Sequence, residues 1–200
     1  MALVAFDNTI LSVLLFPDAD LRQGTEAAPV DRARERVDGL VQELAAAGEQ
    51  VLIPTPALAE VLATPGCDMD EVLSALRVSA YIRIGDFDLR AAVELAVRLR
   101  DAAAKGDIRD GLTITKSRMK FDRQIVAIAL TNGARVLYTD DDGVRKFAED
   151  CGLSVKRTSD LAIPAVQQEL FEGKVATPPA EARASEDAAE QEPPPELKTE

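Results

Sequence analysis

The 200-residue sequence contains no histidine and only two cysteines. Without histidine, the chain cannot use Ser-His-Asp or Cys-His catalysis, and it cannot build an imidazole metal site. Cys67 stands in a Pro-Gly turn and Cys151 beside a glycine, and neither has a second cysteine nearby to complete a zinc or redox motif. Any catalysis must therefore rest mainly on carboxylates.

Long apolar runs are also absent. No run approaches the roughly 18 residues that span a bilayer, and the opening Met1-Ala2-Leu3 lacks the basic segment of a secretory signal. We therefore expect a cytoplasmic protein with no membrane partner. Apolar residues make up 46% of the chain and charged residues 29%, which is typical of a globular protein with an ordinary core.

Basic residues are too few to balance the acids, and the formal net charge is -12. This excess argues against a nucleic-acid partner, because phosphate contacts need Lys and Arg. Residues 175–200 hold seven acidic and two basic side chains, so this end carries -5 and the remainder -7. From Thr177 onward Pro, Ala and Glu dominate without periodicity, which predicts a disordered acidic tail over 177–200.

Short apolar runs bounded by Gly, Pro or Asp alternate with segments of helical periodicity. The apolar runs predict five strands, at 3–6, 51–53, 81–84, 135–138 and 153–155. The periodic segments predict seven helices, at 9–16, 30–47, 56–64, 69–79, 88–104, 117–131 and 143–151. Glycines stand where helix C-caps are expected, at Gly48, Gly106, Gly133 and Gly152. This alternation predicts an α/β fold, a three-layer α/β/α sandwich with a mostly parallel five-stranded sheet.

Carboxylates directly follow two of the predicted strands. Asp7 comes after the first strand, and the run Asp140-Asp141-Asp142 comes after the fourth. Ligands of an open parallel sheet bind beyond the carboxyl ends of its strands, so both positions are candidates for a site. Asp7 could equally be a helix N-cap, and the triple run could be a turn. Three adjacent like charges nevertheless repel unless a cation or water relieves them.

Two further carboxylates stand in apolar helices. Glu60 is the only charged residue within 56–63 (PALAEVLA). Because an isolated buried charge is costly, this carboxylate must face water, pair with a partner or bind a metal. Helical spacing puts Asp122 on the same face as Ile125, Val126 and Ala129. The helix dipole also favours an acid in the first turn, so a structural role for Asp122 stays open.

Four separate segments thus deliver carboxylates that a parallel sheet can gather at one edge. Hard cations such as Mg²⁺ and Mn²⁺ prefer carboxylate and water oxygens, so a cluster without histidine suits them better than Zn²⁺. Such a cluster can orient a phosphodiester and generate a hydroxide nucleophile near neutral pH. The sequence therefore favours metal-dependent chemistry on a phosphate ester.

The order and setting of these residues resemble the PIN domain family over residues 3 to about 158. The family pattern is an Asp after the first strand, a Glu in an apolar helix, an Asp leading an Ile/Ala-rich helix, and a later Thr-x-Asp. The resemblance implies that the catalytic and metal-binding acids are Asp7, Glu60, Asp122 and Asp141. It also makes Thr139 the hydroxyl that braces the site, with Asp140 as the alternative to Asp141.

The chain differs from the family in two places. The first site reads Asp7-Asn8-Thr9 where the family often has Asp-Thr-Asn, so the supporting polar residue is swapped. The segment from Leu21 to Glu49 is also long.

Among PIN proteins, the resemblance points to small VapC-like bacterial ribonucleases, many of which are toxins held inactive by an antitoxin. It implies an Mg²⁺- or Mn²⁺-dependent endoribonuclease that hydrolyses RNA with metal-activated water. The expected partners are RNA, an antitoxin protein and a second copy of the chain. The expected division is a PIN-like nuclease domain over 1–158, a C-terminal extension over 159–176 and the tail over 177–200.

One stretch of basic residues suits the phosphates that flank a cleavage site. It consists of Lys105, Arg109, Lys116, Arg118, Lys120 and Arg123. A solvated loop leading into a helix would have the same composition, and the sequence does not separate the two interpretations.

Two other functions stay open. Residues 6–11 (FDNTIL) faintly resemble the nucleophile motif of haloacid-dehalogenase-like phosphatases. That motif has a second Asp where Thr9 stands, and it does not account for Glu60. The chain could also be a non-catalytic PIN-like binding module whose acidic groove holds a partner, such as an Arg-bearing peptide.

Overall fold

The computed structural model of the chain describes residues 2–16, 29–104 and 116–164, the last of these with side chains from residue 120 onward. Residues up to Pro164 belong to one compact unit. The predicted tail and most of the predicted C-terminal extension lie outside the described residues, as does Gly106. The division at residue 158 stays a prediction.

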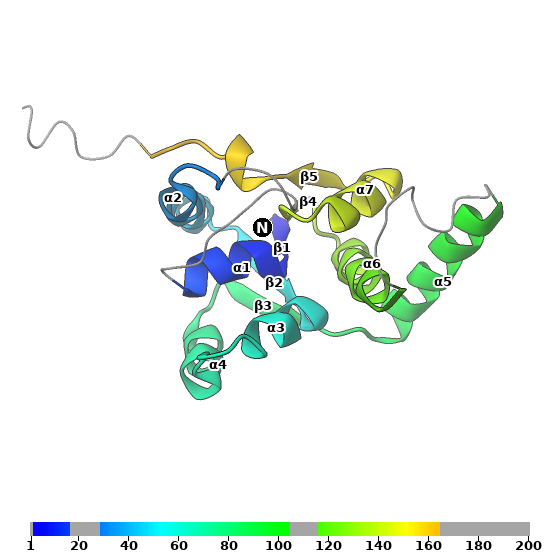
Figure 1. The fold of residues 1–200 in the computed structure, drawn as a ribbon, viewed down its shortest axis with the longest axis horizontal. Helices are drawn as coiled ribbons and strands as arrows, with labels where there is room; N and C mark the ends of the chain where they lie inside the picture. The colour runs from blue at the N-terminus through cyan, green and yellow to red at the C-terminus, as the bar shows by residue number, and fades with distance from the viewer. Residues whose placement is uncertain (1, 17–28, 105–115, 165–200) are drawn as a thin grey trace, which may run out of the picture. The chain divides into compact units, whose positions relative to one another are not determined.

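Five strands form one sheet in the order β3-β2-β1-β4-β5, and every neighbouring pair is parallel (Figure 1). The strands are β1 (Leu3–Phe6), β2 (Gln50–Pro54), β3 (Ile82–Gly85), β4 (Val136–Tyr138) and β5 (Ser154–Lys156). Strand β1 lies at the centre, and the chain builds outward from it first through β2 and β3 and then through β4 and β5. The sheet therefore has its topological switch point between β1 and β4.

Helices connect all the strands, as parallel pairing requires. They are α1 (Asn8–Leu15), α2 (Ala33–Ala46), α3 (Thr55–Leu62), α4 (Met69–Val78), α5 (Leu89–Ala104), α6 (Lys116–Thr131), α7 (Asp142–Asp150) and the short 3-10 helix η1 (Thr158–Asp160). The predicted α/β/α fold class is confirmed, and each predicted element lies within three residues of its observed bounds. Gly48, Gly133 and Gly152 follow helices with φ between 63° and 79°, a conformation that favours glycine.

The two faces of the sheet are covered by different helices. Helices α1, α2 and α4 lie on one side in Figure 1, and α6 lies on the other. Alternation along β2 accounts for this: Ile53 points toward the first group, and Leu52 points toward α6. At the end of β3 the packing is tightest, because a Cβ on Gly85 would lie 2.7 Å from Ile128 Cγ2. A side chain at position 85 would therefore push α6 off the sheet.

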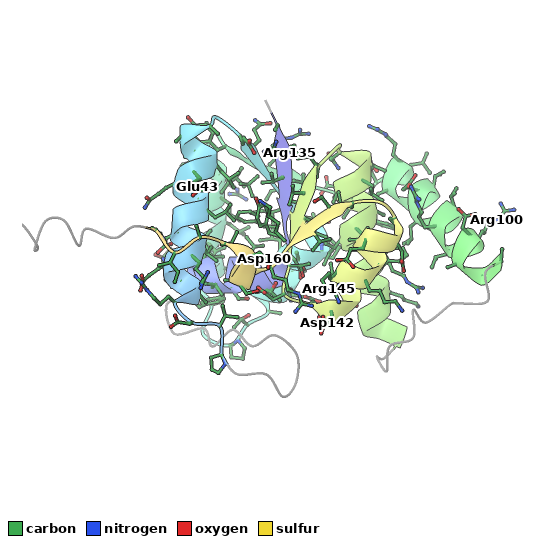
Figure 2. All side chains as sticks on the ribbon, turned by 90° about the horizontal axis from the view of Figure 1, so that it is seen from above. Glu43, Arg100, Arg135, Asp142, Arg145 and Asp160 are labelled. Atoms are coloured by element: carbon green, nitrogen blue, oxygen red, sulfur yellow. The ribbon has the colours of Figure 1, made fainter. Side chains whose placement is uncertain are left out.

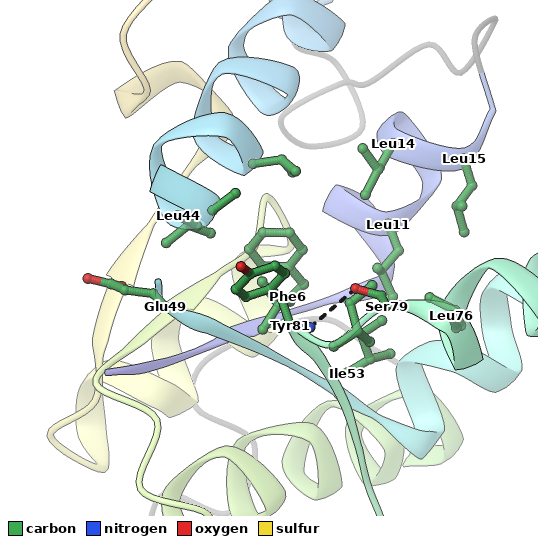
Figure 3. Close-up of a pocket in the computed structure, with 14 residues that line it drawn as sticks. Phe6, Leu11, Leu14, Leu15, Leu44, Glu49, Ile53, Leu76, Ser79 and Tyr81 are labelled. Atoms are coloured by element: carbon green, nitrogen blue, oxygen red, sulfur yellow. Dashed lines mark hydrogen bonds between the residues drawn. The ribbon is translucent and has the colours of Figure 1, made fainter. Parts of the chain in front are cut away.

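The first face encloses an apolar cavity of about 130 Å³ (Figure 3). Its walls come from the sheet and from α1, α2 and α4, with Phe6, Leu11, Leu44 and Leu76 among the lining side chains. The carboxylates singled out in the sequence do not line this cavity, which belongs to the core.

None of the helices that the structure describes is both long enough and apolar enough to cross a bilayer. In the described part of the chain neither Cys67 nor Cys151 forms a disulfide, and both are half-buried.

Candidate functional site

A cleft of about 360 Å³ opens beyond the carboxyl ends of β1 and β4. All four predicted acids line it, and the complete lining is Asp7, Asn8, Glu60, Phe121, Asp122, Asp141 and Val144. Asp7 directly follows β1, Asp141 directly precedes α7, and the other residues belong to the helices α1, α3, α6 and α7. The topology brings them together because β1 and β4 flank the switch point of the sheet, and α3 and α6 contact each other there.

Asp7 lies at the base of this cleft with no exposed surface. Its backbone N–H donates to Tyr138 O at 3.1 Å, which extends the pairing of β1 with β4 by one residue. The residue occupies the N-cap position of α1, but its carboxylate does not cap that helix. The side chain is instead turned toward the β4 side of the cleft. The simple capping role that the sequence left open is therefore wrong for this carboxylate.

Two threonine hydroxyls hold the carboxylate of Asp7. Thr139 Oγ1 donates to Asp7 Oδ2 at 2.6 Å and accepts from the Asp141 N–H at 3.1 Å. Thr9 Oγ1 donates to the same oxygen at 3.5 Å and accepts from the Asp140 N–H at 3.1 Å. Each hydroxyl therefore links β1 to the loop after β4. Among the described residues, no hydrogen bond reaches the other oxygen of Asp7, Oδ1.

Burial raises the pKa of Asp7 to about 7, because it disfavours the charged form of the carboxyl. The hydrogen bond from Thr139 and the backbone N–H of Asn8 oppose this rise because they favour the anion. The negative charges of Asp141 and Glu60 add to it, which means that these acids are close enough to repel Asp7.

The other acids are held by their own helices. Glu60 stands in the middle of α3, and Asn8 Nδ2 donates a hydrogen bond to its Oε2. Asp122 has 6% exposed surface and lies on the α6 face that also buries Ile125 and Val126. The predicted inward direction of Asp122 is therefore confirmed. Asp141 is the N-cap of α7, and its Oδ1 accepts from the N–H groups of Gly143 and Val144 at 2.7 and 3.1 Å.

The donor set of the cleft fits a hard divalent cation, because carboxylates line it and the sequence offers no imidazole. The buried Asp7 Oδ1 and the raised pKa of Asp7 are also what a missing positive charge would leave. In the part of the chain that is described, however, no three acidic or cysteine side chains stand close enough to form a finished ligand set. The acids surround the cleft without meeting at one point.

Comparison with known proteins gives matches only among solved structures: no family model and no curated protein matches the chain. One similar structure is a chain of VapBC2 from Rickettsia felis, which was crystallised with a DNA fragment from the VapBC2 promoter. It superposes on this chain with a TM-score of 0.51 at 15% sequence identity. The match covers 78% of this chain and 98% of that one. A chain of DNA-bound VapBC from Salmonella typhimurium gives a TM-score of 0.49 at 14% identity, covering 79% and 99%.

This chain has the PIN fold.

On this PIN fold, the triple aspartate run is divided among three tasks. Asp140 is 3% exposed, and both its oxygens are used by Thr158, whose N–H and Oγ1 donate at 3.0 and 2.6 Å. Asp141 lines the cleft, and Asp142 pairs with Arg145 and Arg157. Figure 2 shows Arg145 beside Asp142. The repulsion expected from three adjacent carboxylates is therefore relieved by separate partners, and the geometry favours Asp141 over Asp140 as a cleft residue.

The swapped motif also has a clear place in the PIN fold. Asn8 lines the cleft and reaches Glu60, while Thr9 ties Asp7 to the loop after β4. The sequence pattern did not assign either contact to these residues. The difference between Asp7-Asn8-Thr9 and the family's Asp-Thr-Asn was the signal in the sequence for these two contacts, because it marks the positions at which the supporting polar side chains differ.

Two residues of the predicted basic stretch, Lys120 and Arg123, have side chains that the structure describes. Lys120 is exposed, whereas the side chains from Lys105 to Arg118 lie outside the described residues. Arg123 is 6% exposed, with its guanidinium 5.2 Å from the centre of the Phe147 ring. Arg123 is therefore buried under α7 and does not share the exposure of Lys120, while phosphate binding by the rest of the stretch stays a prediction.

Proposed function

We propose that this chain is an Mg²⁺- or Mn²⁺-dependent endoribonuclease and the toxin of a toxin–antitoxin pair. The observation that carries the proposal is the convergence of four carboxylates, from four separate segments, on one cleft at the carboxyl edge of a PIN-fold sheet. The fold match to VapBC2 agrees with the toxin role that the family resemblance implies. RNA is the proposed substrate, an antitoxin is the proposed protein partner, and the cytoplasm is the expected location.

Asp7, Glu60, Asp122 and Asp141 are the residues that would hold the cation. When bound, the cation would neutralise the phosphate and lower the pKa of a water molecule that attacks phosphorus. Thr139 and Thr9 would keep Asp7 Oδ2 occupied, so that Oδ1 is the oxygen offered to the cleft. Asn8 would keep Glu60 turned toward the same space.

The two alternatives have less support. A haloacid-dehalogenase-like phosphatase needs an acid at position 9, whereas Thr9 uses its hydroxyl to bridge Asp7 and the Asp140 N–H. A non-catalytic binding module gives no reason to bury the carboxyl of Asp7, because burial raises its pKa and disfavours the charged form. Phosphoenzyme trapping with a small phosphate ester should fail with this chain, because the proposed reaction forms no aspartyl-phosphate.

The decisive experiment measures Mn²⁺ binding and RNA cleavage on the same preparations. Mn²⁺ should raise the melting temperature of the wild-type chain in proportion to RT ln(1 + [L]/Kd), and cleavage of single-stranded RNA should require the metal. Asp7→Asn and Asp122→Asn should lose both the metal-dependent stabilisation and the cleavage. Asp150→Asn is the matched control, because Asp150 is an exposed acid at the far end of α7.

Retained cleavage in Asp7→Asn or Asp122→Asn would end the assignment. Mn²⁺ stabilisation without cleavage of any single-stranded RNA would leave a metal-binding module and refute the nuclease. The toxin role has its own test: expression should arrest growth, and co-expression of a small DNA-binding protein from the neighbouring reading frame should restore it. Growth that is unaffected by the active enzyme would refute the toxin role alone.

A further inference from the structure

Phe121 is an exposed aromatic side chain in the cleft that the four acids line, here called the acidic cleft. The ring keeps 45% of its surface accessible, although Asp122, the next residue of α6, is buried. Single exposed apolar side chains are common on protein surfaces and carry no meaning by themselves. Of the large apolar side chains that the described part of the chain exposes, however, only Phe121 lines the acidic cleft.

The lining of the acidic cleft has little charge that attracts a phosphate chain. Apart from the four acids, its described residues are Asn8, Phe121 and Val144, and no lysine or arginine is among them. Affinity for nucleic acids usually rests on contacts of Lys and Arg with phosphates. A bound cation would offset part of the negative charge of the acids. Contacts that do not depend on charge must therefore contribute a larger share of the affinity here than in a basic groove.

The ring of Phe121 is the described group of this lining that can supply such a contact. Asn8 donates its side-chain N–H to Glu60, and Val144 has only 2% of its surface exposed. Bases of single-stranded nucleic acids stack on aromatic side chains, and loss of one stack weakens binding by about 5- to 150-fold. A single strand can turn an unstacked base toward the ring, whereas a duplex keeps its bases paired and stacked.

We propose that Phe121 stacks on the nucleobase beside the phosphate that is cleaved, and that this contact selects single-stranded RNA. The inference rests on the proposed nuclease function and adds to it a residue that binds the substrate. Because Phe121 and Asp122 are consecutive, a base on the ring belongs to a nucleotide next to the phosphate that the acids would hold. A purine has a larger face than a pyrimidine, so a purine at this position should be preferred.

RNA binding can be measured without cleavage in chains that carry Asp7→Asn. In this background Phe121→Leu should bind a short single-stranded RNA about tenfold more weakly in fluorescence anisotropy, because leucine is apolar but has no flat ring. Phe121→Trp should bind at least as tightly as the parent. Tyr81→Leu is the matched control and should leave the affinity unchanged. Tyr81 is 47% exposed and precedes β3, at the edge of the sheet opposite the cleft.

Removal of single bases tests the stack directly. In an RNA centred on the mapped cleavage site, an abasic nucleotide is placed at each position in turn. At one position beside the cleaved phosphate, loss of the base should weaken binding to the chain with Phe121 and leave binding to Phe121→Leu unchanged. Such coupling between the base and the ring is the signature of a direct contact. Equal effects on both chains at every position would refute the stacking contact.

Kinetics with Mn²⁺ separate this inference from the proposed function. Phe121→Leu should raise KM for single-stranded RNA about tenfold and change kcat little, because a stacked base binds alike in the ground state and the transition state. A loss of kcat at unchanged KM would mean that Phe121 acts on the acids, and would overturn the stacking. Unchanged KM and affinity with intact cleavage would refute the stacking alone. RNA binding that depends on Phe121 without any cleavage would refute the nuclease alone, and a wild-type chain that neither binds nor cleaves RNA would refute both.

Discussion

Replacing Asp7 with Asn in the metal-free protein should change how stability depends on pH. The folded state raises the pKa of Asp7 from 3.8 to about 7, so between these values the folded chain keeps a proton that the unfolded chain has lost. Stability is therefore greatest, for this group, below the unfolded pKa and falls as pH rises toward the folded one. Asn resembles the neutral acid, can still accept the hydrogen bond from Thr139, and does not titrate.

The magnitude follows from the size of the shift. At about 1.36 kcal/mol for each pKa unit, ionising Asp7 costs the folded state about 4 kcal/mol once the pH is above 7. Between about pH 4.5 and 7.5 the wild-type chain should lose about 3 kcal/mol relative to Asp7→Asn. The comparison of the two chains removes the contribution of all groups that titrate alike in both.

The assay is urea unfolding of both chains, with a metal chelator, at several pH values across this range. The difference between the two free energies of unfolding should grow steadily with pH in favour of Asp7→Asn. Addition of Mn²⁺ should then restore stability to the wild-type chain and leave Asp7→Asn unchanged. Parallel pH profiles in the absence of metal would refute the claim that burial raises the pKa of Asp7 in the folded state.

Three further substitutions test the surroundings of the cleft and the core beneath it. Thr139→Val should cost about 1–3 kcal/mol of unfolding free energy, because Asp7 Oδ2 loses a donor and the Asp141 N–H loses its acceptor, and Thr139→Ser should recover most of that. Asp140→Asn should also lower the free energy of unfolding by about 1–3 kcal/mol, because Asp140 accepts two hydrogen bonds from Thr158. This variant should keep the Mn²⁺-dependent rise in melting temperature. Loss of that rise would make Asp140 a metal ligand. Gly85→Ala should destabilise by about 1–3 kcal/mol in a urea titration, because its Cβ would lie 2.7 Å from Ile128 and 2.9 Å from Leu52, and an unchanged midpoint would mean that α6 shifts freely.

The fold and the position of the acids were largely readable from local patterns. Strands buried on both faces appear as short apolar runs, and most of the helices between them have a glycine or an Asp at one end. Glu60 and Asp122 could be singled out because a carboxylate on the apolar face of a helix is costly to bury unless a partner or a metal balances it. Their convergence follows from the topology, since parallel strands end at the same edge.

The features that could not be predicted from the sequence depend on contacts between distant segments of the chain. Asp140 is held away from a role in the cleft by Thr158, which lies 18 positions after Asp140 in the chain. Asp141 is left as the acid of this run that lines the cleft. The basic stretch suggested a solvent-facing Arg123, but the ring of Phe147 on α7 covers it. Helix α6 contacts α3, α5, α7 and β2, so most of its circumference is interior and neighbours such as Asp122 and Arg123 are both buried.

Asp141 has two duties that a substitution cannot separate: it starts a helix through Oδ1, and it contributes its charge to the cleft. A capping aspartate stabilises a protein by about 1 kcal/mol whether or not any ion is ever bound. A related chain without any nuclease activity would therefore still be stabilised by an aspartate at this position, even if it had lost the carboxylates of Glu60 and Asp122. An aspartate in the Thr-x-Asp motif after β4 is therefore weak evidence that a protein with this fold is an active enzyme. The acids that cap no helix are better evidence of activity.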